Sequence, residues 1–187
     1  MNLLFWTFLI ITSCSTKRAS TDHVNTAKGD TTYSTSTRQL KSNKIPDSVF
    51  QMIDLRHLSI NGMDCDNGDT TNCWRIKEIP IEIKNLVKLT TLRLPVNAVS
   101  TIPAGLTELK NVRLIDLTDN AGLNNVDNLT RLQSLEYLYL YGCGLTKLPD
   151  KLGDLKNLKE LGLVGNNLDN TERTRIRKAL PNCIIRF

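Results

Sequence analysis

Side chains that could carry out covalent chemistry are few in this sequence. Cys143 lies between two glycines, where a thiol could act as a nucleophile, but such a thiol needs an electropositive setting and a nearby base. Of the two histidines, His23 lies in a Ser/Thr-rich N-terminal segment and only His57 lies in the apolar part of the chain. The sequence has no nucleophile-elbow motif, phosphate-binding glycine loop or metal-binding histidine pair. We therefore expect no enzymatic activity, no cofactor and no bound metal.

Three tyrosines directly before Cys143 suggest a different kind of site. Tyr137, Tyr139 and Tyr141 alternate with leucines, so a strand would place the three phenols on one face and the leucines on the other. Tyrosine offers a large contact area with few rotatable bonds and is enriched at protein interfaces. The three phenols are therefore either a ligand contact or a cover for a sheet, and the sequence leaves both open.

A repeated leucine pattern supplies the elements that would position these residues. Units that begin at Leu89, Val112, Leu135 and Leu158 are 23 residues apart and share the pattern L-x-x-L-x-L-x-x-[N/C]. Most units continue with an apolar residue, an aliphatic–proline pair and two further leucines. A long amphipathic helix is excluded, because the prolines would break it.

This pattern resembles the leucine-rich repeat family over residues 45–187. The resemblance implies an α/β solenoid, right-handed and curved, with parallel strands on the concave face, loops and short helical turns on the convex face, and about five repeats plus caps. We expect an N-terminal cap at 40–54, repeats at 55–169 and a C-terminal cap at 170–187. The first repeat is 11 residues longer than the others, which places an insert at 61–75, directly after its strand.

The ninth position of each repeat turns inward where the chain leaves the strand. A side chain there must satisfy backbone groups that the loop cannot pair with each other, and asparagine does this in the family. The predicted ladder consists of Asn97, Asn120, Cys143 and Asn166. Cys143 is thus interpreted as a structural rung rather than a nucleophile, and Cys183 as a buried residue of the C-terminal cap.

The outward positions of the strands form the predicted binding surface. Arg93 and Asp116 fall on adjacent strands, where they can pair with each other. Leucine-rich repeat proteins mostly bind other proteins along the concave face, so the resemblance implies a non-catalytic protein-binding module. A glycan ligand and a structural role in an envelope assembly are the alternatives. The residues predicted to contact a ligand are His57, Arg93, Asp116, Tyr137, Tyr139 and Tyr141.

The N-terminus resembles that of a bacterial lipoprotein. An apolar run from Leu3 to Ile11 is too short to span a bilayer but long enough for an export signal. The following Thr-Ser-Cys resembles a lipobox, which implies a signal peptide at 1–13, a lipid on Cys14 and attachment to the membrane. We expect the protein to be located in the bacterial cell envelope, on the periplasmic or the cell-surface side. Because no basic residue precedes the apolar run, a signal cut elsewhere and a secreted protein are the alternative.

Residues 14–39 are predicted to be a disordered tether. Ser or Thr occupies 11 of the 25 positions from 15 to 39, and almost nothing aliphatic is available for burial. In the insert, Cys65 and Cys73 are predicted to form a disulfide, since the protein is expected to be exported. The acidic residues between them do not match the calcium-loop pattern, so we expect a polar turn rather than a metal site.

The charge of the chain limits the class of partner. There are 24 basic and 19 acidic residues, for a net charge of +5, and the basic excess lies at 15–44 and 171–187. A nucleic-acid partner needs a basic stripe along the folded surface, whereas the middle of this chain is close to neutral. We expect no nucleic acid partner, and we expect a monomer.

Overall fold

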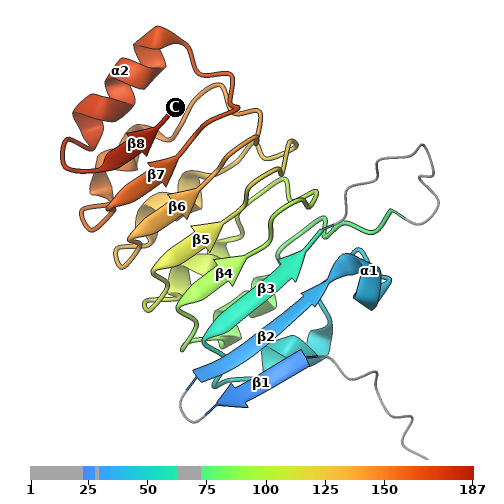
Figure 1. Ribbon diagram of the computed structural model, residues 1–187. Coiled ribbons are helices and arrows are strands. Elements are labelled where there is room, and N and C mark those ends of the chain that lie inside the picture. The colour runs from blue at the N-terminus through green and yellow to red at the C-terminus, as the bar shows by residue number, and fades with distance from the viewer. Residues whose placement is uncertain (1–22, 28–29, 63–72) are drawn as a thin grey trace, which may run out of the picture.

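The computed structural model describes residues 23–27, 30–62 and 73–187, which form one sheet backed by short turns (Figure 1). Eight strands lie side by side in chain order from β1 to β8. β1 (His23–Ala27) pairs antiparallel with β2 (Asp30–Ser36), and every later pairing is parallel. The predicted leucine-rich repeat solenoid is confirmed by this succession of parallel strands.

The strands after β2 follow the repeat, and their register aligns equivalent positions of successive units. Leu114 lies opposite Tyr137, which in turn lies opposite Glu160. Each outward or inward position therefore forms a column that crosses the sheet. The bounds are β3 (His57–Asn61), β4 (Thr91–Arg93), β5 (Leu114–Asp116), β6 (Tyr137–Tyr139), β7 (Glu160–Gly162) and β8 (Ile184–Arg186).

Five short 3-10 helices among the described residues form the layer behind the sheet. A proline precedes four of them directly, and its fixed φ angle suits the start of such a turn. The fifth, η5, follows Val126. Their bounds are η1 (Asp47–Gln51), η3 (Ile81–Asn85), η4 (Ala104–Glu108), η5 (Asp127–Arg131) and η6 (Asp150–Asp154).

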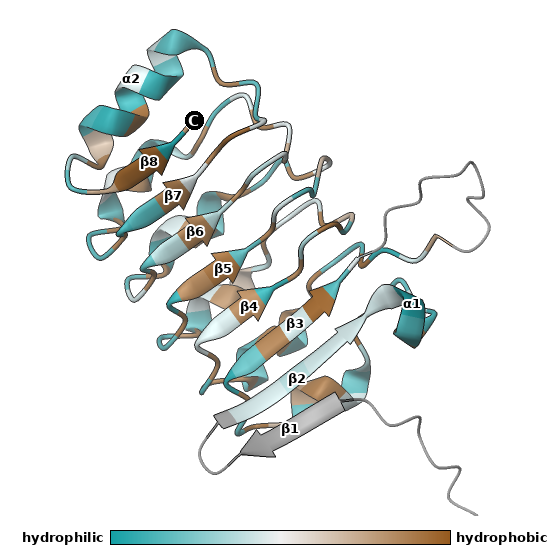
Figure 2. Cartoon of the chain, viewed as in Figure 1, coloured by the Kyte–Doolittle hydropathy of each residue, from teal (hydrophilic) through white to brown (hydrophobic). Residues whose placement is uncertain are grey.

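The core is a stack of leucine and isoleucine columns between the two layers. Leu92, Ile115, Leu138 and Leu161 form the central column and are each at most 1% exposed. Figure 2 shows these hydrophobic positions along the middle strands, in contrast to a mostly hydrophilic helix α2 (Asn170–Ala179). Because each repeat buries its leucines against its neighbours, no repeat has a core of its own.

The N-terminal end differs from the predicted disordered tether. Within residues 30–40 the chain forms β2 and a short helix, α1 (Thr37–Leu40), instead. Tyr33 of β2 lies opposite Leu58 and is 2% exposed. Composition alone was misleading here, because Thr and Tyr suit a pleated strand and β3 offers an edge to which the backbone can hydrogen-bond. Residues 1–22, which include Cys14, lie outside the described residues.

Both ends of the repeat stack are covered. At the N-terminal end, Ile45, Val49 and Phe50 are buried in the core, and Met52 is half-buried against it. At the C-terminal end, Ile176 of α2 is fully buried. The half-buried residues that pack on the core after α2 are Cys183, Ile185 and Phe187.

Glu172 of α2 joins the C-terminal cap to the preceding repeat. Its carboxylate accepts the Leu148 N–H at 2.7 Å and two hydrogen bonds from Arg175 at 2.6 and 2.8 Å. The hydrogen bond from Arg175 holds the pKa of this carboxyl below its usual range, although burial opposes the shift. Among the described residues, no helix is long and apolar enough to cross a membrane.

Most of the predicted insert lies outside the described residues. Cys65 belongs to this part, so its disulfide with Cys73 stays a prediction. The end of the insert contacts the N-terminal segment: Thr37 Oγ1 donates to the Trp74 carbonyl, and the Arg75 N–H donates to Asn43 Oδ1 at 2.8 Å. These contacts place the exit of the insert beside α1.

Candidate protein-binding surface

The inward ladder residues hold the loops that follow the strands. In Asn120, Oδ1 accepts the Val99 N–H and Nδ2 donates to the carbonyls of Leu94 and Leu117, each at 2.9 Å. Asn166 makes the three equivalent hydrogen bonds, and Asn97 makes the two equivalent bonds to the Ile76 N–H and the Ile60 carbonyl, with a third to the Pro95 carbonyl. Each rung thus connects its own repeat to the one before it, and the hydrogens of each Nδ2 are used within the fold.

Cys143 forms the third rung of the ladder. Its Sγ is fully buried and donates to the Leu117 carbonyl at 3.1 Å. Burial raises the pKa of the Cys143 thiol to about 11, while a hydrogen bond with the Asn120 backbone acts in the opposite direction. At neutral pH the thiol is therefore protonated and inaccessible, which is the opposite of what a nucleophile requires.

A thiol cannot replace the accepting oxygen of asparagine, and the neighbouring loop reflects this. The other rungs accept the N–H of the residue 21 positions earlier, which for Cys143 is Gly122. Gly122 is exposed, and Leu123 takes the inward place one residue late. The loop with irregular spacing, around Gly122 and Leu123, is thus the one for which the next repeat supplies a cysteine instead of an asparagine.

The tyrosine row, which we define as Tyr137, Tyr139 and Tyr141, occupies the open face of the sheet. All three side chains are half-buried. The rings of Tyr139 and Tyr141 stack, with centroids 5.7 Å apart and an interplanar angle of 13°. Lys159 Nζ lies 6.0 Å from the centre of the Tyr137 ring. None of the three hydroxyl groups hydrogen-bonds to another described residue, so all three remain available to a partner.

Gly162 provides the space that Tyr141 occupies. A Cβ at Gly162 would collide with the Tyr141 ring, so any larger residue there would displace the phenol. Gly162 lies opposite Tyr139 in the sheet register. Because Gly162 of β7 has no side chain, the Tyr141 ring can lie over it and stack on Tyr139.

The phenols of Tyr139 and Tyr141 are neutral under ordinary conditions. Burial raises the pKa of Tyr139 and of Tyr141 above the usual range, and the Glu160 carboxylate raises both further. A neutral phenol both donates and accepts hydrogen bonds. The row can therefore contact either kind of polar group as well as apolar surface.

Ion pairs surround the tyrosine row. Arg93 pairs with Asp116 at 3.1 Å, as the sequence suggested, and Asp116 Oδ1 also accepts the Thr118 N–H. Three further pairs were not singled out from the sequence, although the members of the two pairs with Glu136 are 23 residues apart and so occupy equivalent positions of adjacent repeats. They are Arg113 with Glu136 at 3.2 Å, Lys159 with Glu136 at 2.7 Å and Arg186 with Glu160 at 2.7 Å.

His57 is not part of this cluster. It is half-buried on β3, three strands from the row on β6, which corresponds to about 14 Å at the usual strand spacing. Arg93 and Asp116 lie on the two intervening strands. The structure therefore brings Asp116 and the tyrosines together and leaves His57 at a distance.

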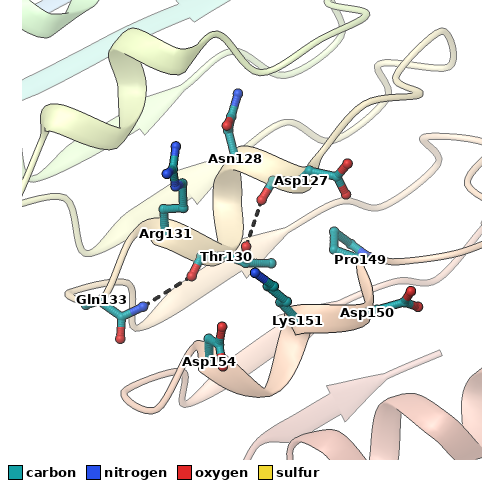
Figure 3. A pocket seen from close by; sticks show the side chains of 9 residues that line it. All are labelled: Asp127, Asn128, Thr130, Arg131, Gln133, Pro149, Asp150, Lys151 and Asp154. Atoms are coloured by element: carbon teal, nitrogen blue, oxygen red, sulfur yellow. Dashed lines mark hydrogen bonds between the residues drawn. The ribbon is translucent and has the colours of Figure 1, made fainter.

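A polar groove of about 570 Å³ lies on the opposite side of the molecule, between η5 and η6 (Figure 3). A Cβ at Gly105 would collide with the Ile81 carbonyl, so glycine lets η4 lie close to η3. The equivalent positions in η5 and η6 are Asn128 and Lys151, which line the groove. Among the described residues, no group of three His, Cys, Asp or Glu could hold a metal ion. The lining residues are Asp127, Asn128, Thr130, Arg131, Gln133, Pro149, Asp150, Lys151 and Asp154.

Comparison with known proteins supports this description of the fold. The family model described as a leucine-rich repeat region matches residues 35–186. The chain belongs to the leucine-rich repeat family. Proteins of this family and fold are typically non-catalytic, and the family indicates a protein-binding module.

Solved leucine-rich repeat structures resemble the chain. A leucine-rich repeat protein of Leptospira interrogans is 32% identical with a TM-score of 0.67, over 77% of this chain and 34% of that chain. An internalin of Listeria monocytogenes has a TM-score of 0.61 at 17% identity, over 77% of this chain and 38% of that one, and shows the fold alone.

Curated relatives are much longer proteins. Volume-regulated anion channel subunit LRRC8B of Mus musculus is 32% identical over 146 residues, 74% of this chain and 17% of its own length. A uridine 5'-monophosphate transferase of Xanthomonas campestris is 39% identical over 70 residues, 37% of this chain and 13% of its own length. The chain spans less than a fifth of either relative.

Proposed function

We propose that this protein is a non-catalytic module that binds another protein through the open face of its sheet, with the tyrosine row at the centre of the contact. The observation that carries the proposal is the row itself: three half-buried phenols without a hydrogen-bond partner among the described residues. Their backbone is held in a sheet, so binding has little backbone entropy to overcome. Large aromatic side chains on a rigid support are typical of the residues that dominate interface energies.

A protein partner is favoured over the glycan alternative by the geometry of the rings. Sugars bind to the open flat faces of aromatic rings, whereas Tyr139 and Tyr141 each cover one face of the other. The row thus offers ring edges and hydroxyl groups more than free flat faces. Such edges suit the irregular mixture of apolar and polar groups on a protein surface.

We propose that the domain is anchored in the bacterial cell envelope by a lipid on Cys14 and that Cys65 and Cys73 form a disulfide. The lipobox-like residues before Cys14 support the first, and the expected oxidising compartment supports the second. Expression with an alkyne-labelled fatty acid should label the wild-type chain and not Cys14→Ser. Equal labelling of both chains would contradict the anchor.

The binding proposal is tested by capture of envelope proteins on the immobilised full chain. The triple variant Tyr137→Ala, Tyr139→Ala, Tyr141→Ala should lose at least 90% of the captured partner, because ring area and hydroxyl groups both disappear. A triple variant in the groove, Arg131→Ala, Gln133→Ala, Lys151→Ala, serves as the matched control and should retain capture. Equal capture by the two triple variants would refute a contact at the tyrosine row.

A further inference from the structure

The ion pairs around the tyrosine row share an orientation that the sequence does not reveal. In every pair the carboxylate is covered and the cation is exposed. The exposed fraction of the side chain is 53% for Arg93 and 8% for its partner Asp116. It is 68% for Arg113 and 62% for Lys159, but 18% for Glu136, which pairs with both. It is 57% for Arg186 and 20% for its partner Glu160.

Four cations therefore form the outer layer of this surface, above three carboxylates. We call Arg93, Arg113, Lys159 and Arg186 the cationic rim. An approaching molecule meets the guanidinium and ammonium groups first, and the covered carboxylates offset part of their charge. The exposed members of these pairs are all cations, although the formal charges of the pairs nearly balance.

We propose that the partner meets this surface with an acidic segment that also carries apolar or aromatic side chains. This inference rests on the proposed function, since it names the chemistry of the protein that the tyrosine row contacts. Carboxylates of the segment contact the cationic rim, and its apolar side chains cover the phenol rings. A basic segment is repelled, which adds specificity to the contact.

The dimensions of the rim define the length of the segment. Arg93 is on β4 and Arg186 is on β8, four strand spacings apart, which corresponds to about 19 Å. An extended chain covers that distance in about six residues. A segment of this length crosses the strands and passes over the tyrosine row, on β6 and directly after it.

The inference is tested first by selection of random dodecapeptides displayed on phage against the full chain. We expect the selected peptides to be acidic, to contain aromatic or aliphatic residues, and to lose binding on the triple tyrosine variant. Selected peptides that are neutral or basic, but whose binding depends on the tyrosines, would overturn the inference of an acidic partner and leave the proposed function in place. Peptides that bind the triple tyrosine variant equally well would overturn the proposed function.

Charge variants then test the rim with a synthetic copy of a selected peptide. The double variant Arg113→Gln, Lys159→Gln should weaken binding about tenfold at low salt and reduce the salt dependence, because two rim charges are lost. The double variant Arg131→Gln, Lys151→Gln in the groove removes the same charge elsewhere and should leave affinity within about twofold.

Glu136→Gln gives a test in the opposite direction. It removes the carboxylate beneath Arg113 and Lys159 and leaves both cations, so affinity for the acidic peptide should rise about threefold or more. A merely structural role for Glu136 predicts weaker binding, because the two cations would lose their support. Unchanged or weaker binding in a folded Glu136→Gln protein would overturn the cationic rim.

Discussion

The inward and outward side chains of the same strands differ in burial and in how much the residue type varies from repeat to repeat. Leu138 and Tyr139 are neighbours on β6, yet Leu138 is 1% exposed and belongs to a column of leucines and isoleucines, whereas Tyr139 is half-buried. Across β4 to β7 the outward column with Tyr139 reads Arg93, Asp116, Tyr139 and Gly162. Packing in the core makes each inward column uniform, whereas the outward column contains residues of four different types.

The difference should be largest when an inward leucine is compared with its outward neighbour. Leu138→Ala should lower the free energy of unfolding by about 2–5 kcal/mol, because it leaves a cavity between three stacked repeats. Tyr139→Ala should lower it by about 1 kcal/mol or less and should act mainly on binding. Urea unfolding followed by circular dichroism measures both. Similar losses of stability in the two variants would break the distinction between the faces.

The ladder provides the next largest effect. Asn120→Ala removes the amide that accepts from the Val99 N–H and donates to the Leu94 and Leu117 carbonyls, at a cost of about 2–4 kcal/mol. Asn157→Ala is the matched control, because its amide is exposed and donates only to the Gln133 carbonyl. We expect its stability to change by less than about 0.5 kcal/mol. A thermal melt that shifts equally for both would show that the inward amide has no special role.

Glu172 extends the comparison to charged groups. Its pKa is held below the usual range by the Arg175 hydrogen bond, so it contributes stability above the pKa of the unfolded chain, and this stability is lost as the pH falls through the folded value. Glu172→Gln should lower stability at pH 7 by about 1–3 kcal/mol and flatten the decline in stability below about pH 4.5.

The exposed pair of Asp54 with Lys88 at 2.6 Å is the control for this titration. The Lys88 hydrogen bond also lowers the pKa of Asp54, but solvent and salt screen the pair. Asp54→Asn should leave the pH profile of urea unfolding almost unchanged. A change as large as that for Glu172→Gln would remove the distinction between covered and exposed carboxylates.

Apart from the control variants, Gly162→Ala should have a small effect on stability, and it tests the outward face alone. The added methyl group collides with the Tyr141 ring, so the stacked pair must separate, while the inward residues stay in place. We expect a change in stability within about 1 kcal/mol, an altered near-ultraviolet circular dichroism signal and weaker peptide binding. Gly153→Ala, at a site away from the row, should leave the aromatic signal unchanged.

Much of the inward architecture was predictable from spacing. The 23-residue period placed Asn97, Asn120 and Asn166 at equivalent inward positions, and the structure shows the hydrogen bonds that this position requires. The tyrosines could be assigned to the outward face because side chains alternate along a strand. Spacing could not show the stacking of Tyr139 on Tyr141, which depends on the space above Gly162.

Strand β2 was not predicted, because the composition of the segment does not show that the edge of β3 is available to pair with it. A Ser/Thr-rich segment buries little apolar area by itself, which favours disorder. β3 supplies backbone partners for β2 and a place for Tyr33 against the core, and these offset the cost of ordering. Only the position of one segment against another reveals this stabilisation.

The sequence by itself determined the repeat, the register of the columns and the division of residues between core and surface, because these follow from local periodicity and the exclusion of leucine from water. The tertiary structure alone decided which charges are covered and which are exposed. The low exposure of Asp116, Glu136 and Glu160 depends on side chains of the neighbouring strands that contact them. That low exposure turns a nearly balanced set of charges into a cationic rim around the tyrosine row.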